Sequence, residues 1–482
     1  MNKQVLTAIL FALFSSACAV GPDYARPASE LPDDWQAGSE AAADRTDLGQ
    51  WWTAFNDPAL VAVIEESLAH NNDLKAAVAN VDAAAAALRL ARADYLPTVN
   101  GVIDGTRTKA STNSALPLGS APYTEYSAGL LVNYELDIWG RVRRANEAAI
   151  AELNRDVAVR DGVHSAVAAA TAQAWFQARA LDRQVALLER LHETRIDNLR
   201  LQQTRLDAGL IPPYDFEQAR SETAAVAAQL PVLRAARLQA LTALAVLRGA
   251  TPQAMVTEWS AERARAETAL AAVHVLPVAP AVPMDLPSAL LERRPDVRAA
   301  EQRLVASNAR IGVAKAAYFP RLSLTGFAGG ISTAFSSLFE SPSESWQASV
   351  ALAQPLTDIN RVGASVNAAT ARHAAETANY SSTVQRAFKE TLDALTGVST
   401  AREVMRAQDE RVAALTNAYR VAEARYQAGR IGYLDVLDVE RQLREIEQQQ
   451  VVARLSLLQA TVDLYRALGG GWQDSPVLAD TR

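Results

Sequence analysis

Cysteine and histidine are scarce in this chain, which has one cysteine, Cys18, and five histidines in 482 residues. A disulfide within the chain is therefore impossible, and the histidines share no spacing typical of a metal site. The sequence contains no Gly-x-Ser-x-Gly segment and no phosphate-binding glycine loop. It thus indicates neither an enzyme nor a bound cofactor, and the net charge of −7 gives no reason to expect a nucleic-acid partner.

Proline is absent from Leu356 to Ser475. Within this stretch, Arg361 to Ala428 is predicted to form one helix, residues 428–432 a break, and Asp435 to Leu468 a second helix. A helix of that first length would extend about 100 Å at ~1.5 Å per residue. The apolar residues are mostly alanine, and small side chains let helices approach closely. We therefore expect a packed array of long helices rather than a globular core.

The N-terminus has the composition of an export signal. Lys3 is followed by the apolar segment Val5–Phe14 and by small residues up to Cys18. We predict that residues 1–17 are a lipoprotein signal peptide and that Cys18 is the acylated first residue of the mature chain. Ordinary signal-peptidase cleavage near Ala17 is the alternative. No later apolar run of about 20 residues was found, so no transmembrane helix is expected.

Two strands are predicted after a helix from Pro58 to Asp94, at Thr98–Thr108 and Tyr126–Asp137. In the second strand apolar residues alternate with small or polar ones, and Leu131 is the exception on the polar side. This alternation is typical of a strand in a membrane barrel. An edge motif in a soluble protein would give the same alternation.

The chain is a tandem repeat with an offset of 220 residues. Helices are predicted from Arg141 to Ala208 and on to Arg248, and strands recur at residues 321–328 and 346–354. The pairs that define the offset are Arg141 and Arg361, Gly209 and Gly429, Asp215 and Asp435, and Gly249 and Gly469. The predicted regions are an extended segment at 18–56, the first repeat at 57–250, a connector at 251–286, the second repeat at 287–472 and a tail at 473–482.

The repeat provides four strands per chain, which is too few to close a barrel, because small closed barrels need about eight. An open sheet edge is not tolerated in lipid. If these strands enter a membrane, several chains must therefore share one barrel.

Several motifs together resemble TolC-type outer-membrane efflux proteins, and specifically the lipoprotein (NodT-like) branch that serves resistance-nodulation-division (RND) pumps. The resemblance covers essentially the whole mature chain. Its motifs are Cys18 with Val20–Tyr24, Trp51-Trp52 with Phe55, Asp137–Arg141, Leu290–Val297 with Phe319-Pro320, and Ala467–Trp472.

The resemblance implies a mainly α fold with a small β part. It also implies a homotrimer in which twelve strands close an outer-membrane β-barrel and twelve long helices form a periplasmic α-barrel. Its partners would be a periplasmic membrane-fusion adaptor, an inner-membrane RND pump and outer-membrane lipid. The protein would be a passive exit duct for drugs and other small amphiphiles, lipid-anchored in the outer membrane and extending into the periplasm.

The two helix turns are the candidate sites. By the resemblance, the predicted periplasmic gate contains Asp438, Asp435, Tyr426, Gln427 and Asp215. Carboxylates brought together by symmetry in a narrow pore would raise one another's pKa. Alternatively, Asp215 and Asp435 cap the helices that follow, and Asp438 is an acid favoured by the helix dipole.

The turns themselves are predicted to dock the adaptor through Gly209, Gly429 and Gly432, although glycine there could serve only to end a helix. A rival hypothesis for the whole protein is a lipid-anchored periplasmic helical scaffold without a pore. The matching alternation in all four predicted strands favours the shared barrel.

Overall fold

The computed structural model describes residues 19–28, 48–109, 111, 121–267, 276–281 and 293–472. The predicted signal peptide, the lipidation site Cys18 and the predicted tail 473–482 lie outside the described residues. The chain divides into two compact units. The strand unit comprises residues 80–156 and 299–381 with the N-terminal segment up to residue 28, and the helical unit comprises residues 29–79, 157–298 and 382–482. Each unit therefore takes segments from both sequence repeats.

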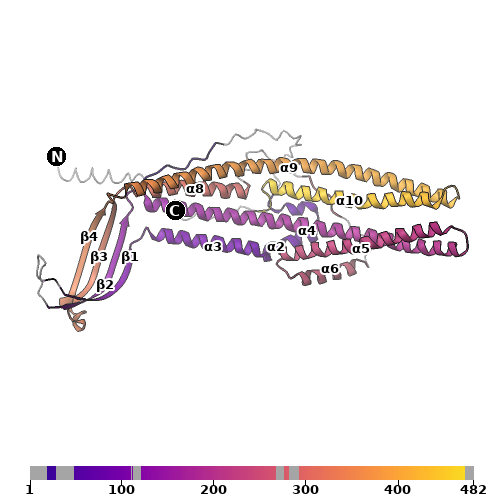
Figure 1. The fold of residues 1–482 in the computed structure, drawn as a ribbon. Helices are drawn as coiled ribbons and strands as arrows, with labels where there is room; N and C mark the ends of the chain where they lie inside the picture. Colours follow the sequence, from indigo (N-terminus) through magenta and orange to yellow (C-terminus); the bar gives the residue numbers. More distant parts are fainter. Residues whose placement is uncertain are drawn as a thin grey trace. The chain divides into compact units, whose positions relative to one another are not determined.

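The structure is mainly helical, with four strands (Figure 1). The helices are η1 (Leu48–Phe55), α2 (Pro58–His70), α3 (Asn72–Ala93), α4 (Arg141–Asp207), α5 (Pro213–Leu247), α6 (Pro252–Glu267), α8 (Pro295–Ala316), α9 (Ile359–Gln427) and α10 (Tyr433–Ala467). The strands are β1 (Thr98–Thr108), β2 (Tyr123–Leu136), β3 (Arg321–Ser332) and β4 (Glu344–Ala353), and short 3₁₀ turns η3 (Phe335–Ser337) and η4 (Ser341–Ser343) separate β3 from β4.

The predicted element order is found twice, as α3-β1-β2-α4-α5 and as α8-β3-β4-α9-α10. The long helices α4 and α9 have 67 and 69 residues, and each is followed by a helix of 35 residues. β1 has the predicted bounds, and β3 extends four residues beyond its predicted end. β2 and β4 begin three and two residues before their predicted starts, and each ends one residue before its predicted end.

One predicted helix is two helices, because α2 and α3 are separated at Asn71. This residue has an extended backbone (φ −60°, ψ 133°) and is 3% exposed. Its Oδ1 accepts the backbone N–H of Leu74 at 3.0 Å, and its amide donates to the carbonyl of Leu247 at 3.0 Å. The prediction of one helix from Pro58 to Asp94 was wrong, because Asn71 caps α3 and binds the end of α5.

The expectation that no later helix could cross a membrane also needs correction. Among the described helices, α5 is long and apolar enough to do so by length and composition alone. However, Val226 and Leu230 of α5 pack against Leu188 of α4, and Leu244 is fully buried in the main core. Some apolar residues of α5 therefore pack against other helices, whereas Val232 and Val246 are 67% and 65% exposed.

The four strands form one antiparallel sheet in the order β1-β2-β3-β4. The register pairs Val99 with Val132, Leu130 with Ala328 and Ala328 with Trp346, so one face collects most of the apolar side chains of the four strands. This apolar face carries Val99, Ile103, Ala128, Leu130, Val132, Leu322, Leu324, Ala328, Trp346, Val350 and Leu352. The opposite face carries Asn100, Asp104, Ser127, Asn133, Glu135, Ser323, Thr325, Gln347 and Ser349.

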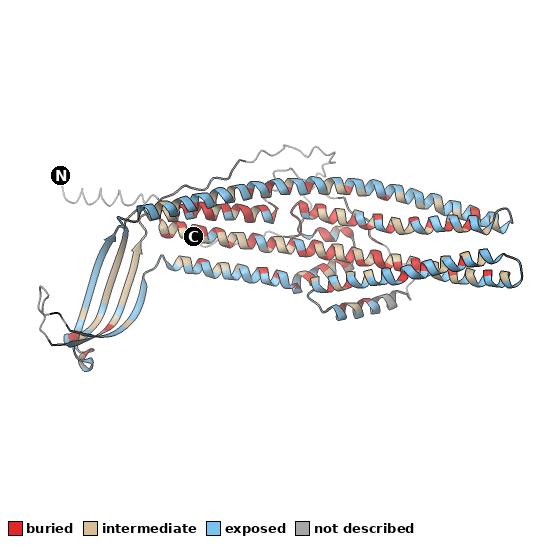
Figure 2. Cartoon of the chain, in the orientation of Figure 1, coloured by how far each residue is buried: buried red, intermediate tan, exposed pale blue. Residues whose placement is uncertain are grey.

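Little of this sheet is buried (Figure 2). On the apolar face Ile103, Trp346 and Val350 are 80%, 78% and 70% exposed. Leu131, the exception to the alternation, pairs with Phe327 on the polar face, so the two apolar side chains cover each other. The sheet therefore has an uncovered apolar face and two strand edges, β1 and β4, that pair with no other described strand.

An aromatic core holds the helical unit together. Trp51, Trp52 and Phe55 of η1 are each 2% exposed. The Trp51 ring stacks on Tyr465 of α10 at 5.3 Å, and the Phe55 ring lies 5.1 Å from Phe176 of α4. The Trp-Trp-x-x-Phe motif is thus a packing element, which joins the segment just before the first repeat to the end of the second. The prediction that residues 18–56 are extended was wrong at Leu48–Phe55, which form a 3₁₀ helix because their aromatic side chains pack into this core.

A second motif, Arg294-Pro295-Asp296, ties the start of α8 to the end of α10. Arg294 is 6% exposed and donates to Asp296 at 2.8 Å, to Glu390 at 2.6 Å and to the carbonyl of Ala467 at 3.1 Å. Burial opposes ionisation of Asp296, but the hydrogen bond and charge of Arg294 outweigh it and hold the pKa of Asp296 below its usual value. The Arg-Pro-Asp motif is therefore a clamp between the repeats.

Candidate gate and membrane sheet

Both helix turns end in the same backbone motif. Gly209 and Gly429 are left-handed, with φ of +67° and +70°. After each glycine, the next N–H bonds to the carbonyl five residues back, from Leu210 to Arg205 and from Arg430 to Arg425. This is a Schellman ending, which requires a residue that tolerates positive φ. A Cβ at either glycine would meet no other described atom within 4 Å, so each glycine is required for its backbone angle and leaves an open surface.

Tyr426, a predicted gate residue, is held by an arginine that the sequence analysis did not name. Arg205 Nη1, at the end of α4, donates to the hydroxyl of Tyr426 at 2.9 Å. The Tyr426 ring also lies 5.5 Å from Tyr433, at the start of α10. The repeat contained the signal for this contact, because Arg205 is 220 residues before Arg425 and occupies the equivalent position in the first turn.

The two aspartates after the turns differ. Asp435 accepts the backbone N–H of Gly432 at 3.0 Å and so satisfies one free donor at the start of α10, which is the acidic half of a capping box. The equivalent residue before Asp215 is Pro212, which has no N–H, and α5 has no side-chain cap. Of the two alternatives stated for these residues, capping is therefore observed for Asp435 and not for Asp215.

Asp438 lies on the exposed surface of α10, with its side chain 54% exposed. It accepts hydrogen bonds from Arg441 at 2.8 Å and from Gln442 at 2.7 Å, and these bonds lower its pKa. Gln427 is also exposed, at the end of α9. Within one chain, Asp438 is thus an ionised residue at the surface, available to neighbouring chains.

A buried ion pair lies further along the helices from the turns. Arg195 of α4 and Glu440 of α10 are 3.3 Å apart, and their side chains are 5% and 7% exposed. Burial raises the pKa of the nearby Tyr433 to about 12. These residues connect α4 to α10 with a charge pair that sequence reasoning did not find, because neither residue belongs to a recognisable motif.

Aromatic side chains mark both ends of the sheet. At the helix end, Trp139 stacks on Phe319 at 4.6 Å. At the other end, Tyr126 lies 5.6 Å from Phe335, and Trp346 is exposed. Aromatic rings at both borders of an apolar band are typical of a membrane barrel.

The motif Asp137–Arg141 forms the junction from β2 to α4. Asp137 accepts the backbone N–H groups of Val142 and Arg143, each at 2.9 Å, and so caps α4. Gly140 has a φ of +78°, and a Cβ there would lie 2.8 Å from the Cβ of Ala19. The motif therefore turns the chain from strand to helix and leaves room for the N-terminal segment.

This N-terminal segment, residues 19–28, lies along α4 and α8 as a strap. The backbone N–H of Val20 donates to the Trp139 carbonyl at 3.1 Å. Asp23 pairs with Arg144 at 2.7 Å, and Arg26 binds both carboxylate oxygens of Glu301, at 2.6 and 2.8 Å. The strap thus begins beside Trp139, at the helix end of the sheet.

Comparison with known proteins shows which family this chain belongs to. A profile described as outer membrane efflux protein matches residues 63–250 and 286–470. The chain belongs to the outer membrane efflux protein family. It is 33% identical to the probable efflux pump outer membrane protein TtgC of Pseudomonas putida over 489 aligned positions, which cover 98% of this chain and 97% of TtgC. It is 32% identical to the cation efflux system protein CusC of Escherichia coli, with coverage of 98% and 100%.

Solved structures of this family have the same fold. The outer-membrane channel OprN superposes with a TM-score of 0.84 at 30% identity, covering 94% of this chain and 100% of OprN. The open state of the MtrE outer membrane channel of Neisseria gonorrhoeae superposes with a TM-score of 0.81 at 28% identity, covering 95% and 99%. The predicted family, fold class and function as an outer-membrane efflux channel are confirmed, and the protein is placed in the outer membrane. The gate, docking and lipidation residues stay predictions.

Proposed function

We propose that the protein is the exit duct of a tripartite efflux pump, assembled as a homotrimer. The observation that carries the proposal is the four-stranded sheet with one apolar face and two unpaired edges. Lipid does not tolerate open edges, so β4 of one chain must pair with β1 of the next. Three chains would supply twelve strands, and their long helices would line a tunnel through the periplasm. The rival scaffold without a pore is disfavoured, because the similar solved structures are channels.

The native mass of the protein, extracted from outer membranes in mild detergent, tests the trimer. A mass of three chains is expected. A stable monomer would refute the shared barrel, because four strands cannot close on themselves.

The helix turns are the surface that we propose for a periplasmic membrane-fusion adaptor, through which the duct would reach an RND pump. Leu210 and Tyr214 at the first turn are 74% and 68% exposed, and Leu434 at the second is 50% exposed. Apolar side chains exposed at helix tips are typical of an interaction site. Around Gly209 and Gly429 no described atom lies within 4 Å of the position that a Cβ would take, and at Gly432 the nearest is Asp435 Oδ2 at 3.6 Å, so the turns leave room for a helical hairpin to approach.

The gate is proposed at the same turns, from Asp438, Asp435, Tyr426, Gln427 and Asp215. Support comes from the Arg205–Tyr426 hydrogen bond, which ties α4 to α9, and from the ionised surface carboxylate of Asp438. Asp438→Ala is expected to loosen the tips and to raise the conductance of the channel in lipid bilayers. Asp358→Ala is the control, because Asp358 also pairs with an arginine three residues on, near the other end of α9. Equal conductance in wild type and Asp438→Ala would refute the gate role.

Acylation of Cys18 is proposed from the position of the strap. The Val20 N–H is bonded to the Trp139 carbonyl and Ala19 lies against Gly140, so the described chain that directly follows Cys18 begins beside the helix end of the sheet. A diacyl group there would reach the inner leaflet of the outer membrane. Mass spectrometry of the mature N-terminal peptide should show the lipid on Cys18. A free amine on Ala19 or on an unmodified Cys18 would refute it.

The proposed cargo is small amphiphiles. Relatives are named for antibiotic and toluene efflux, although CusC is named for cations. Energy must come from the pump partner. Drug susceptibility of cells that express the duct with different adaptors would identify the pump and its substrates.

A further inference from the structure

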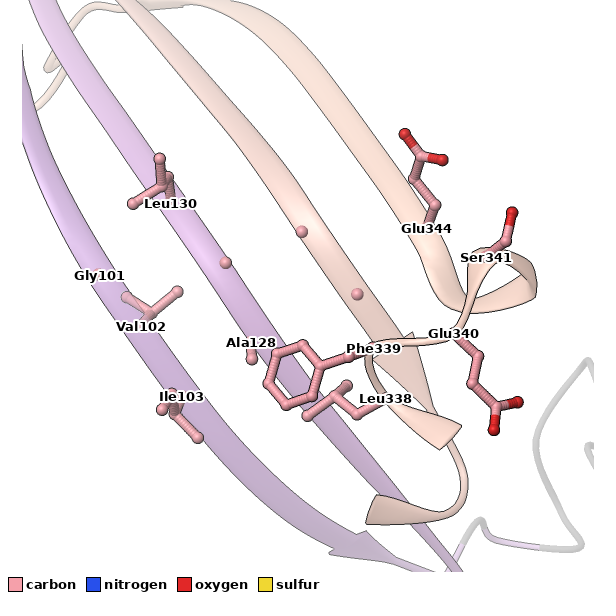
Figure 3. A pocket seen from close by; sticks show the side chains of 13 residues that line it. Gly101, Val102, Ile103, Ala128, Leu130, Leu338, Phe339, Glu340, Ser341 and Glu344 are labelled. Atoms are coloured by element: carbon pink, nitrogen blue, oxygen red, sulfur yellow. The ribbon is translucent and has the colours of Figure 1, made fainter. Parts of the chain in front are cut away.

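A groove of about 690 Å³ lies on the apolar face of the sheet, towards the strand ends that are away from the helices (Figure 3). Ile103 and Leu130 project from β1 and β2 on one side, and Leu338 and Phe339, from the connection between β3 and β4, lie on the other. This connection folds back over the sheet, and we call residues 335–343 the hook. Glu340, Ser341 and Glu344 border the groove at its β4 side.

Glycines form the floor of the groove. Gly330 pairs with Ala128 on the apolar face, and Gly101 lies on the same face of β1, so these three floor positions carry little or no side chain. A Cβ at Gly330 would lie 2.2 Å from the Leu338 carbonyl oxygen, which shows that the hook rests directly on this glycine. A Cβ at Gly101 would meet nothing within 4 Å among the described residues. The floor is therefore filled at the hook and empty at β1.

The hook is held in place without filling the groove. Ser332 and Ser337 share a hydrogen bond of 2.8 Å between their hydroxyls, and the Ser343 hydroxyl donates to the Ser337 carbonyl at 2.8 Å. Leu338 is 1% exposed, whereas Phe339 is 79% exposed. A hook that served only to cover the sheet would bury both side chains. Here the hook buries Leu338 and leaves Phe339 exposed along one side of the groove.

The environment of the groove indicates its occupant. The groove opens on the face that every strand makes apolar, so it faces lipid and not the pore. Ile103, Leu130 and Phe339 together present a large apolar surface there, and burying such surface stabilises a complex by about 25 cal/mol per Å². A pore substrate would meet the opposite, polar face.

The charged residues around the groove indicate how a bound lipid would be oriented. Arg107 is on the same face of β1 as Ile103, four residues closer to the strand end, and it is exposed. Four strand residues correspond to about 13 Å. Glu340 and Glu344 lie on the β4 side and would repel an anion there. An anionic headgroup is therefore directed to Arg107, with its chain running along β1 into the groove.

We propose that this groove binds an acyl chain of lipopolysaccharide, with a phosphate of the lipid on Arg107. The proposal rests on the proposed function, because the periplasmic position of the helices places this end of the sheet in the outer leaflet. The bound chain would fill the gap between the hook and β1. The site would keep the hook on the lipid side of the barrel, away from the exit of the pore.

The test is the lipid that remains with the protein after extraction from outer membranes in mild detergent and extensive washing, measured by mass spectrometry. Gly101→Leu fills the empty floor and is expected to reduce retained lipopolysaccharide by about tenfold or more. Val99→Leu adds bulk to the same face of the same strand outside the groove, and should retain lipid as the wild type does. Arg107→Gln should reduce retention of lipopolysaccharide. Phe339→Ala removes one side of the groove without changing a strand, and it should reduce retention as well.

The outcomes separate the inference from the function on which it rests. Equal retention in Gly101→Leu and wild type would overturn the groove as the site. Retention of phospholipid in place of lipopolysaccharide would overturn the proposed source of the chain. Native mass and outer-membrane fractionation of each variant are measured in parallel. A wild type that is monomeric or absent from the outer membrane would refute the proposed function itself.

Discussion

Neutralising Glu440 tests whether the buried pair with Arg195 holds α4 and α10 together. The charged atoms are 3.3 Å apart, and both side chains are more than nine-tenths buried. At an effective dielectric constant of about 20, their attraction is about 5 kcal/mol. Glu440→Gln keeps the shape but leaves Arg195 as a buried cation, and the Nε of Arg195 already has no hydrogen-bond partner. We expect a loss of about 3–5 kcal/mol.

Thermal unfolding in detergent, followed by circular dichroism, measures the effect. A loss of that size should lower the midpoint by about 3–5 °C, because unfolding a chain of 482 residues has an entropy of about 1 kcal/mol/K. Replacing both partners by methionine removes both charges and fills the space, so Arg195→Met with Glu440→Met should restore the midpoint or raise it. Asp197→Asn is the control on the same helix. Asp197 pairs with Arg200, but both side chains are 75% exposed, and the loss should stay below about 1 kcal/mol.

The results can refute the reasoning in two ways. If the double variant unfolds as early as Glu440→Gln, the unpaired charge is not the cause and the side chains matter for their shape. If Asp197→Asn is as damaging as Glu440→Gln, burial does not decide the strength of these pairs.

Three further predictions concern other carboxylates. Asp435→Ala should cost about 1 kcal/mol because it removes a cap, whereas Asp215→Ala should cost nearly nothing; equal shifts in the unfolding midpoint would contradict this difference. The lowered pKa of Asp296 contributes stability that is present above its unfolded pKa of about 3.9 and lost as pH falls through the lower folded pKa. Asp296→Asn should therefore flatten the pH dependence of unfolding below about pH 4. Glu301→Gln should release the strap, seen as faster cleavage by chymotrypsin after Tyr24, and an unchanged cleavage rate would contradict its role.

Local features of the sequence were sufficient to predict most elements. Periodicity, the absence of proline and the glycines at Gly209 and Gly429 predicted the long helices and their ends, because helix termination depends on the nearest residues. The alternation of apolar and polar residues predicted the strands, because it too is a local pattern along the chain. The fold class followed from these elements and the repeat. The break at Asn71 was missed, because its cause is a contact with Leu247, which is distant in the sequence.

The candidate site could be predicted only in part. The turns were located, and capping by Asp435 was among the alternatives. The absence of an equivalent cap at Asp215 could not be predicted, because the sequence did not show that α5 begins directly after Pro212. Proline has no N–H that Asp215 could accept. The gate roles of Asp438 and Gln427 depend on neighbouring chains and stay predictions.

The sequence by itself determined what each segment is: long helices, short amphipathic strands and a repeat that leaves the sheet incomplete. Tertiary structure alone decided which residues meet. Arg205 reaches Tyr426 across 221 positions, and Tyr24 reaches Glu301 across 277. The pairing register of the strands places most of their apolar residues on one face. The hook folds over that face and forms one wall of the groove. Such contacts depend on how the elements pack in space, and no local pattern encodes them.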